Sequence, residues 1–273
     1  MNSKLKLSTK LSPNGKTQLA EYFATSPFKV MVLPHYAGIW HQGLNAMQMS
    51  SSPGVLAGDL LDIQISLAKS TALSLNTQAF TRVQAMNERE SAEQITKIDL
   101  AEYSRLFYLP HPLVLHKDSA FKQKTIIEMQ PNSELIYGEI VAIGRVLNDE
   151  RFAFRQFSSH LKIYALQNDG QKRPLVSDCI QWLPSSMNLT ALSQMENYSH
   201  QGSLIYLNLG KSAVELKVIL QTIHTHISEE KTMLVGASLL NSSGIMVRVL
   251  GHRAEQIQEL FQTFAKYFQR ESI

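Results

Sequence analysis

The stretch that decides the fold lies in the first quarter of the chain and reads Ile63-Gln64-Ile65-Ser66-Leu67. Apolar and polar side chains alternate along it, which places one kind on each face of a half-buried β-strand. The same alternation follows in Leu73-Ser74-Leu75 and precedes it at Leu5 and Leu7, which are separated by lysines. Asn14-Gly15 then interrupts the first run, and Asn-Gly between two alternating segments predicts a β-hairpin.

Short apolar runs continue along the next hundred residues and are separated by turn residues. They span Ile95 to Leu100, Arg105 to Leu109, Thr125 to Met129, Leu135 to Ile143, Phe152 to Phe157 and Leu161 to Leu166. Strands at a spacing of about ten residues, with almost no helical pattern before residue 185, are typical of a large β architecture. We therefore expect a mainly β protein with mostly antiparallel strands, built as a sandwich, a barrel or a flattened solenoid.

The last third of the chain has a different pattern. Ser203 to Leu209 reads as a strand, and Ser212 with Glu215 forms a capping box that predicts the start of a helix. Two apolar runs flanking residues 241–244 predict a hairpin, and a second amphipathic helix closes the chain. We expect helices at 212–228 and 254–269. No linker divides the sequence, so we predict one domain over 1–273, with a β-rich body at 1–200 and a β-α-β-β-α end at 201–273.

Composition and missing motifs exclude several classes of protein. The 273 residues are 44% hydrophobic and 18% charged with a net charge of +3, which indicates a globular protein without a nucleic-acid surface. The single cysteine, Cys179, cannot form an intrachain disulfide and favours a reducing compartment, the cytoplasm. No apolar run approaches the roughly 18 residues of a membrane span. The sequence contains no nucleotide P-loop, dinucleotide fingerprint, His-Glu-x-x-His or Gly-x-Ser-x-Gly motif, so we expect no catalytic residues.

Three segments combine glycine or proline with charged or polar residues. In the first, Pro53-Gly54 and Gly58-Asp59 precede Asp62 at the start of a strand, which is also what an ordinary turn would contain. The second is Thr77-Gln78, a polar pair where apolar alternation should continue. In the third, Glu139 lies within an apolar strand that ends at Gly144-Arg145. A carboxylate there must face solvent, pair with an arginine or line a wet interior space.

Taken in this order, these segments resemble the UreD/UreH family of urease accessory proteins. The resemblance rests on Pro53-Gly54 with Gly58-Asp59, on Thr77-Gln78-Ala79, and on Glu139-Ile140 leading to Gly144-Arg145. It extends over nearly the whole chain, through Arg248-Val249-Leu250 to the final amphipathic helix. Where the family often has a lysine and an aromatic residue after the Thr-Gln pair, this chain has Arg82 and Gln84.

The resemblance implies a non-enzymatic maturation factor. Members of the family bind apo-urease, recruit the helical partner UreF and through it the GTPase UreG, and are thought to pass nickel through an internal tunnel. It also implies a stacked-sheet, β-helix-like body with two helices toward the C-terminus. No tightly bound cofactor is expected, only nickel(II) in transit. For the polar lining of such a tunnel, Asp59, Asp62 and Glu139 are the candidates.

Two other functions are compatible with the residues alone. The first is a β-sandwich module that binds carbohydrate or protein and has no metal role. The second is a metal-dependent hydrolase in which Asp59 and Asp62, three residues apart at a strand entry, bridge a metal ion, although no partner base or further ligand is identifiable.

Overall fold

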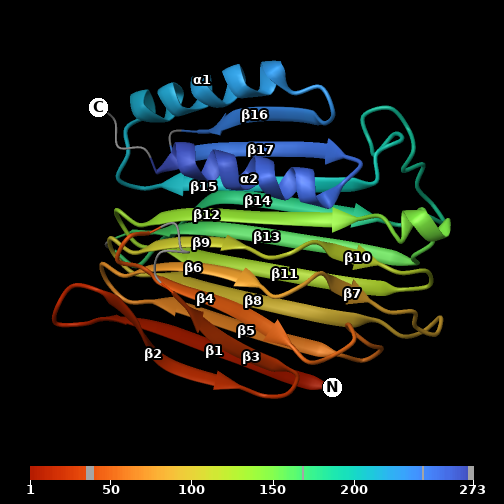
Figure 1. The fold of residues 1–273 in the computed structure, drawn as a ribbon, viewed down its shortest axis with the longest axis horizontal. Helices are drawn as coiled ribbons and strands as arrows, with labels where there is room; N and C mark the ends of the chain where they lie inside the picture. Colours follow the sequence, from red (N-terminus) through yellow and green to blue (C-terminus); the bar gives the residue numbers. More distant parts are fainter. Residues whose placement is uncertain (35–39, 168, 242, 270–273) are drawn as a thin grey trace.

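The computed structural model describes residues 1–34, 40–167, 169–241 and 243–269, and Figure 1 shows them as two stacked β-sheets with two helices. The seven-stranded sheet contains, in spatial order, β14 (Lys172–Trp182), β13 (Gln156–Leu166), β11 (Ala120–Met129), β8 (Ala92–Leu100), β5 (Leu60–Leu67), β1 (Asn2–Leu11) and β2 (Thr17–Ala24). The ten-stranded sheet contains β16 (Leu234–Leu240), β17 (Gly244–Gly251), β15 (His200–Asn208), β12 (Glu134–Ala142), β9 (Arg105–Leu109), β6 (Ala72–Thr77), β4 (Leu44–Ser50) and β3 (Phe28–Leu33). The short β10 (Leu113–Leu115) pairs with β12, and β7 (Thr81–Val83) pairs with β10.

The chain alternates between the two sheets as it advances, in the manner of a flattened β-solenoid. β4, β6, β9 and β12 lie side by side in one sheet, while the intervening β5, β8, β11 and β13 lie side by side in the other. Because each strand returns to its sheet after a full coil, these neighbours are parallel. The mainly β, stacked-sheet prediction is thus confirmed. The expectation of mostly antiparallel pairing is wrong for the central strands and holds for the end hairpins, including the one predicted at Asn14-Gly15.

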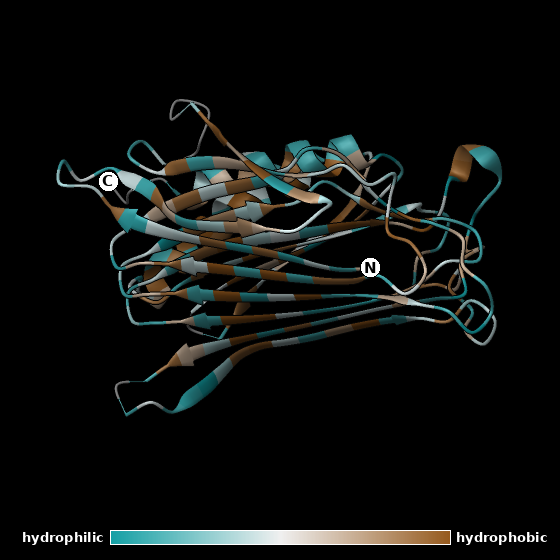
Figure 2. Cartoon of the chain, turned by 90° about the horizontal axis from the view of Figure 1, so that it is seen from below, coloured by the Kyte–Doolittle hydropathy of each residue, from teal (hydrophilic) through white to brown (hydrophobic). Residues whose placement is uncertain are grey.

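Alternation of side chains builds the core between the sheets, and Figure 2 shows it as hydrophobic and hydrophilic residues taking turns along the strands. Leu7, Ile65, Ile98, Ile127 and Ile163 are in register on five neighbouring strands of the seven-stranded sheet. Each of these five side chains is at most 2% exposed. Such a row excludes water from between these five strands and the opposite sheet, and its burial stabilises the solenoid.

The C-terminal end adds a second core on the outer side of the ten-stranded sheet. Helix α1 (Ala213–Glu229) starts at the predicted capping box, in which the Ser212 hydroxyl accepts from the Glu215 amide and the Glu215 carboxylate accepts from the Ser212 amide. Helix α2 (Ala254–Phe268) buries Ile257, Phe261 and Phe264. Figure 1 shows both helices at the end of the molecule that holds β15, β16 and β17. Within the described ranges, neither helix is long and apolar enough to cross a membrane.

Candidate functional site

A polar layer interrupts the apolar core between the two sheets. Next to the aliphatic row of the seven-stranded sheet, Thr96 on β8 is in register with Thr125 on β11, and one step further Gln94 is in register with Gln123. Both threonines are buried. These residues share the inward face of their strands with Ile98 and Ile127 because side chains two positions apart point to the same side. Hydroxyl and amide groups therefore face the interior.

The ten-stranded sheet supplies the opposite side of the layer. Gln48 on β4 pairs in register with Thr77 on β6, while Glu139 on β12 pairs with Ser203 on β15, which in turn pairs with Arg248 on β17. Each of these residues continues the inward-facing set of its strand beyond a buried apolar residue. Polar groups from both sheets thus follow one another from the N-terminal coils to the C-terminal hairpin.

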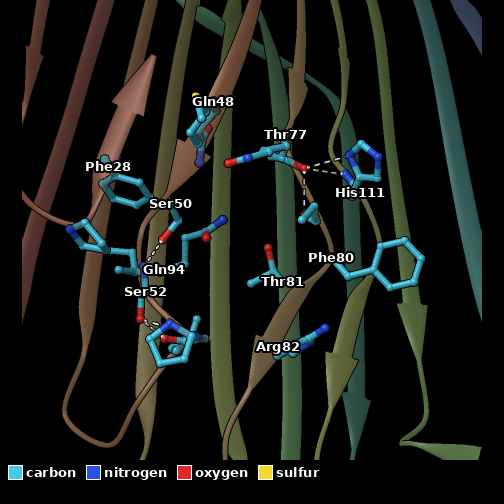
Figure 3. A pocket seen from close by; sticks show the side chains of 18 of the residues that line it. Phe28, Gln48, Ser50, Ser52, Thr77, Phe80, Thr81, Arg82, Gln94 and His111 are labelled. Carbon is cyan, nitrogen blue, oxygen red and sulfur yellow. Dashed lines mark hydrogen bonds between the residues drawn. The ribbon is translucent and has the colours of Figure 1, made fainter. Parts of the chain in front are cut away.

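A pocket of about 510 Å³ opens at the N-terminal side of this layer. Four positions singled out from the sequence lie in its wall, namely Pro53, Gly54, Thr77 and Gln78, and Asp59 lines it as well. Figure 3 shows Thr77 and His111 on one side of the pocket, with Phe28, Ser50 and Ser52 on the other. The structure therefore brings together residues that are up to 84 positions apart in the sequence, from Pro27 to His111.

The pocket continues inward into a smaller cavity of about 60 Å³, enough for a few water molecules. The two spaces share the lining residues Gln48, Thr77, Thr81, Gln94 and His111. At this junction the Thr77 hydroxyl accepts a hydrogen bond from the His111 amide at 2.7 Å and lies 3.3 Å from the imidazole Nδ1. The smaller cavity then reaches Gln123, Tyr137 and Glu139.

Glu139 is the charged group of the smaller cavity. Its two carboxylate oxygens accept hydrogen bonds from the Tyr137 hydroxyl and, at 3.3 Å, from the Ser159 hydroxyl, which itself accepts from Gln123 at 2.9 Å. Burial raises the pKa of the Glu139 carboxyl above its usual range, and the two hydrogen bonds oppose that shift. Burial also raises the pKa of Tyr137 well above its usual range, so its phenol stays protonated as a donor. The accessible part of Glu139 faces the cavity that it lines.

An ion pair between the two sheets follows Glu139 in the polar layer. The Arg248 guanidinium on β17 donates to the Asp178 carboxylate on β14 at 2.6 Å. Both charges act on Glu139, since Asp178 raises and Arg248 lowers its pKa. Arg248, picked from the sequence as a motif position, therefore lies near Glu139 and neutralises an acid that the sequence analysis did not select.

The structure separates the two aspartates that the sequence analysis considered together. The Asp59 carboxylate accepts from the N-terminal ammonium at 2.9 Å and from the Leu56 amide at 2.8 Å, so it anchors the start of the chain beside the pocket. Asp62 lies between the buried Leu61 and Ile63 along β5 and therefore points to the outer face of the sheet. The expectation that Asp62 lines an interior route is therefore wrong, because its side chain lies on the opposite face of β5 from Leu61 and Ile63. The two carboxylates also do not face one another, as a bridging metal site would require.

Three further motif positions shape the backbone away from the polar layer. Gly58 adopts φ of +74°, the left-handed conformation in which glycine is favoured, in the turn that leads to β5. Gly144 adopts φ of +145° after β12, where an added Cβ would lie 1.7 Å from the Glu150 carbonyl oxygen. Arg145 forms an ion pair with Glu150, with Nε 2.8 Å from the carboxylate. Arg145 thus holds its own loop together instead of pairing with Glu139.

The donor set of the layer is suited to weak and successive contacts with a hydrated cation. It consists of amide and hydroxyl oxygens, the His111 imidazole and the Glu139 carboxylate, spread over several strands. Within the described part of the chain, no three histidine, cysteine, aspartate or glutamate side chains gather closely enough to hold a metal ion. Oxygen and imidazole groups bind divalent transition metals, and a chain of incomplete sites allows an ion to move on.

Most residues of this layer cannot be recognised one at a time, although the sequence contains a signal for them. Gln94-x-Thr96-x-Ile98 recurs 29 residues later as Gln123-x-Thr125-x-Ile127, with the same polar-to-apolar order on the same face of each strand. Taken singly, each glutamine and threonine reads as the exposed end of a strand. They are identified as interior residues only because they lie on the same face of their strands as the buried isoleucines Ile98 and Ile127.

Comparison with known proteins connects this architecture to one family. The family model described as UreD urease accessory protein matches residues 1–273. Urease accessory protein UreD of Haemophilus influenzae (strain PittGG) is 77% identical over 266 residues, which cover 97% of this chain and 98% of that protein. Urease accessory protein UreD of Actinobacillus pleuropneumoniae serotype 5b (strain L20) is 64% identical over 272 residues, which cover 100% of this chain and 99% of that protein.

Proposed function

The chain belongs to the UreD family of urease accessory proteins, and on that premise we propose that it helps to deliver nickel(II) to the active site of urease. In this role it is a maturation factor that makes and breaks no covalent bond. It binds the urease apoprotein and the accessory proteins UreF and UreG in the cytoplasm. Nickel is its cargo, held only in transit.

The observation that supports this proposal is the polar layer between the sheets. It runs from the pocket, past the Thr77–His111 contact, to Glu139 at the deeper cavity. A solenoid of this length needs no polar interior for stability, because burying polar groups costs free energy that apolar packing would not. A hydrated cation does need such groups, since they replace part of its water shell as it passes.

The raised pKa of Glu139 fits the transit of an ion. Protons compete with a metal cation for a carboxylate whose pKa is raised by burial, so metal binding to Glu139 weakens as the pH falls. A single carboxylate with hydroxyl neighbours attracts nickel without completing a coordination sphere. The ion therefore moves on once a better site is available.

The partner roles follow from what the chain lacks as well as from the family. Its sequence has no P-loop, so GTP hydrolysis would belong to UreG. A binding module without a metal role would not require urease as its partner. Co-purification of the wild-type chain with the urease apoprotein therefore separates the two functions, and failure to co-purify would favour the module.

The decisive experiment uses the urease subunits co-expressed with all accessory proteins, with this chain as wild type, Glu139→Gln or Glu259→Gln. Glutamine keeps the shape of Glu139, and its amide oxygen can still accept from the Tyr137 hydroxyl while its NH₂ donates to the Ser159 oxygen, so the fold and the partner contacts should be unchanged. We expect the nickel content of purified urease and its activity to fall with Glu139→Gln. Glu259→Gln makes the same chemical change at an exposed position of α2, away from the cavity, and should leave both unchanged.

Full nickel content in urease matured with Glu139→Gln would contradict the interior route. Sustained hydrolysis of a test ester or amide by the purified chain with added divalent metal would instead support the hydrolase. The separate orientations of Asp59 and Asp62 argue against that result.

A further inference from the structure

The outer face of the seven-stranded sheet is a large open surface that the polar interior does not explain. Both helices pack against strands of the other sheet. Seven strands spaced about 4.8 Å apart, each eight to eleven residues long at about 3.3 Å per residue, present a nearly flat area of about 900 Å². That area matches the roughly 800 Å² that each partner contributes to a standard protein interface.

Lysines occupy this face in register. In one row across the strands Lys6, Lys97 and Lys162 take every second strand, from β1 through β8 to β13. The next row contains Lys4 on β1 and Lys124 on β11. Because β11 lies between β8 and β13, Lys124 is a diagonal neighbour of both Lys97 and Lys162. A third row adds Lys122 beside Glu93. Neighbouring lysines of adjacent rows are about 8 Å apart at Cβ, as strand spacing and rise require.

The face is positive because few acids accompany these lysines. The three rows contain six lysines against two carboxylates, Asp62 and Glu93. The adjacent row of the same face adds Asp99 and Glu128, and Glu128 forms an ion pair with Lys172 of β14. Seven lysines thus stand against four carboxylates, a surplus of three charges. Across the ranges that the structure describes, none of the six lysines belongs to an ion pair. Like charges about 8 Å apart repel one another within the Debye length at physiological salt, so the arrangement costs free energy in the isolated chain.

Two partly buried isoleucines lie among the lysines. Ile95 is in register with Lys124, and Ile126 lies between Lys97 and Lys162. Apolar contacts within a charged surround are typical of protein interfaces, whereas a membrane or nucleic acid would favour an uninterrupted basic surface without carboxylates. The combination of flatness, area, surplus charge and apolar centre fits a folded protein with an acidic patch.

We propose that this lysine face, defined by Lys4, Lys6, Lys97, Lys122, Lys124 and Lys162, is the docking surface for an acidic patch of the urease apoprotein. The inference rests on the proposed function for the identity of the partner. Charge complementarity across the face speeds association and sets the orientation of the complex. The open end of the interior route is then held in a fixed position relative to urease.

The test is a charge-reversal variant, Lys97→Glu/Lys124→Glu/Lys162→Glu, assayed for binding to purified urease apoprotein by surface plasmon resonance. We expect binding at least about tenfold weaker than for the wild type, with the loss mainly in the association rate at low salt. For the wild type, raising NaCl from 50 to 500 mM should weaken binding, and the variant should lose most of that salt dependence.

The matched control, Lys217→Glu/Lys231→Glu/Lys266→Glu, makes the same change in charge at exposed positions on the helical side of the molecule. It should bind urease like the wild type, and thermal melts should show that both variants fold. Equal urease binding by the lysine-face variant and the wild type would overturn the docking surface. So would a variant that keeps urease but loses UreF, or loses only binding to anionic phospholipid vesicles. Absence of urease binding by the wild type would instead refute the proposed function.

Discussion

Gly144→Ala is predicted to destabilise the protein severely, and Gly58→Ala is its matched control. Both glycines have positive φ, at +145° and +74°. They differ in surroundings. A Cβ at Gly144 would lie 1.7 Å from the Glu150 carbonyl oxygen and 2.9 Å from its carbon, whereas a Cβ at Gly58 would meet nothing within 4 Å.

The magnitudes follow from these two environments. Alanine in the left-handed conformation costs about 1–2 kcal/mol, and this is the whole expected effect of Gly58→Ala. At Gly144 the backbone conformation alone costs about 1–3 kcal/mol. The contact adds to this because backbone, which cannot rotate away like a side chain, must move by more than 1 Å from the 1.7 Å separation. We therefore expect a total above about 3 kcal/mol for Gly144→Ala, in the range of severe single substitutions.

The assay is urea unfolding followed by circular dichroism, with thermal melts as a second measure. At about 2–4 °C per kcal/mol for a chain of this size, Gly58→Ala should lower Tm by about 2–8 °C and Gly144→Ala by more than about 6 °C. Movement of Glu150 should also break its ion pair with Arg145, so Arg145→Ala should cost less in the Gly144→Ala background than in the wild type. Equal stability of the two glycine variants would refute the steric argument.

Two further predictions concern the core and the dependence of stability on pH. Ile98 is fully buried in the aliphatic row. Ile98→Ala should therefore lower the free energy of unfolding by about 2–5 kcal/mol and Ile98→Val by about 0.5–1.5 kcal/mol, as measured by urea titration. Similar values for both variants would contradict the close packing of that row. Burial lowers the pKa of His200, so the unfolded chain binds a proton more readily than the native one, and the stability this residue contributes should be present above pH 6.5 and decline as the pH falls. Urea midpoints between pH 7.5 and 5.5 should therefore fall less for His200→Gln than for the wild type, and parallel curves would show that His200 has no part in the acid sensitivity.

Local sequence patterns predict most of the segments that form strands and both segments that form helices. Side-chain alternation predicts many of the strands, but the strand predicted from Phe152 to Phe157 is wrong for most of its length, because residues 152–155 form the loop before β13. Asn14-Gly15 predicts the β1–β2 hairpin, and Ser212 with Glu215 predicts the start of α1 within one residue. Each of these signals acts between residues close together in the chain, through backbone conformation or a hydrogen bond across a few residues. The position of Asp62 on the outer face could also be predicted, because it is out of phase with Leu61 and Ile63.

The parallel pairing and the polar layer depend on contacts that no local pattern specifies. Glu139 lies in a strand covered on both faces, by the opposite sheet on one side and by α2 on the other, so alternation cannot tell which side it faces. Arg248 and Asp178 are 70 residues apart and meet because the packing of two sheets brings β17 and β14 together. Register between coils likewise aligns Gln94 with Gln123. Strand formation can therefore be predicted from neighbouring residues, whereas the polar layer and the lysine face form only once distant strands have been stacked in one register.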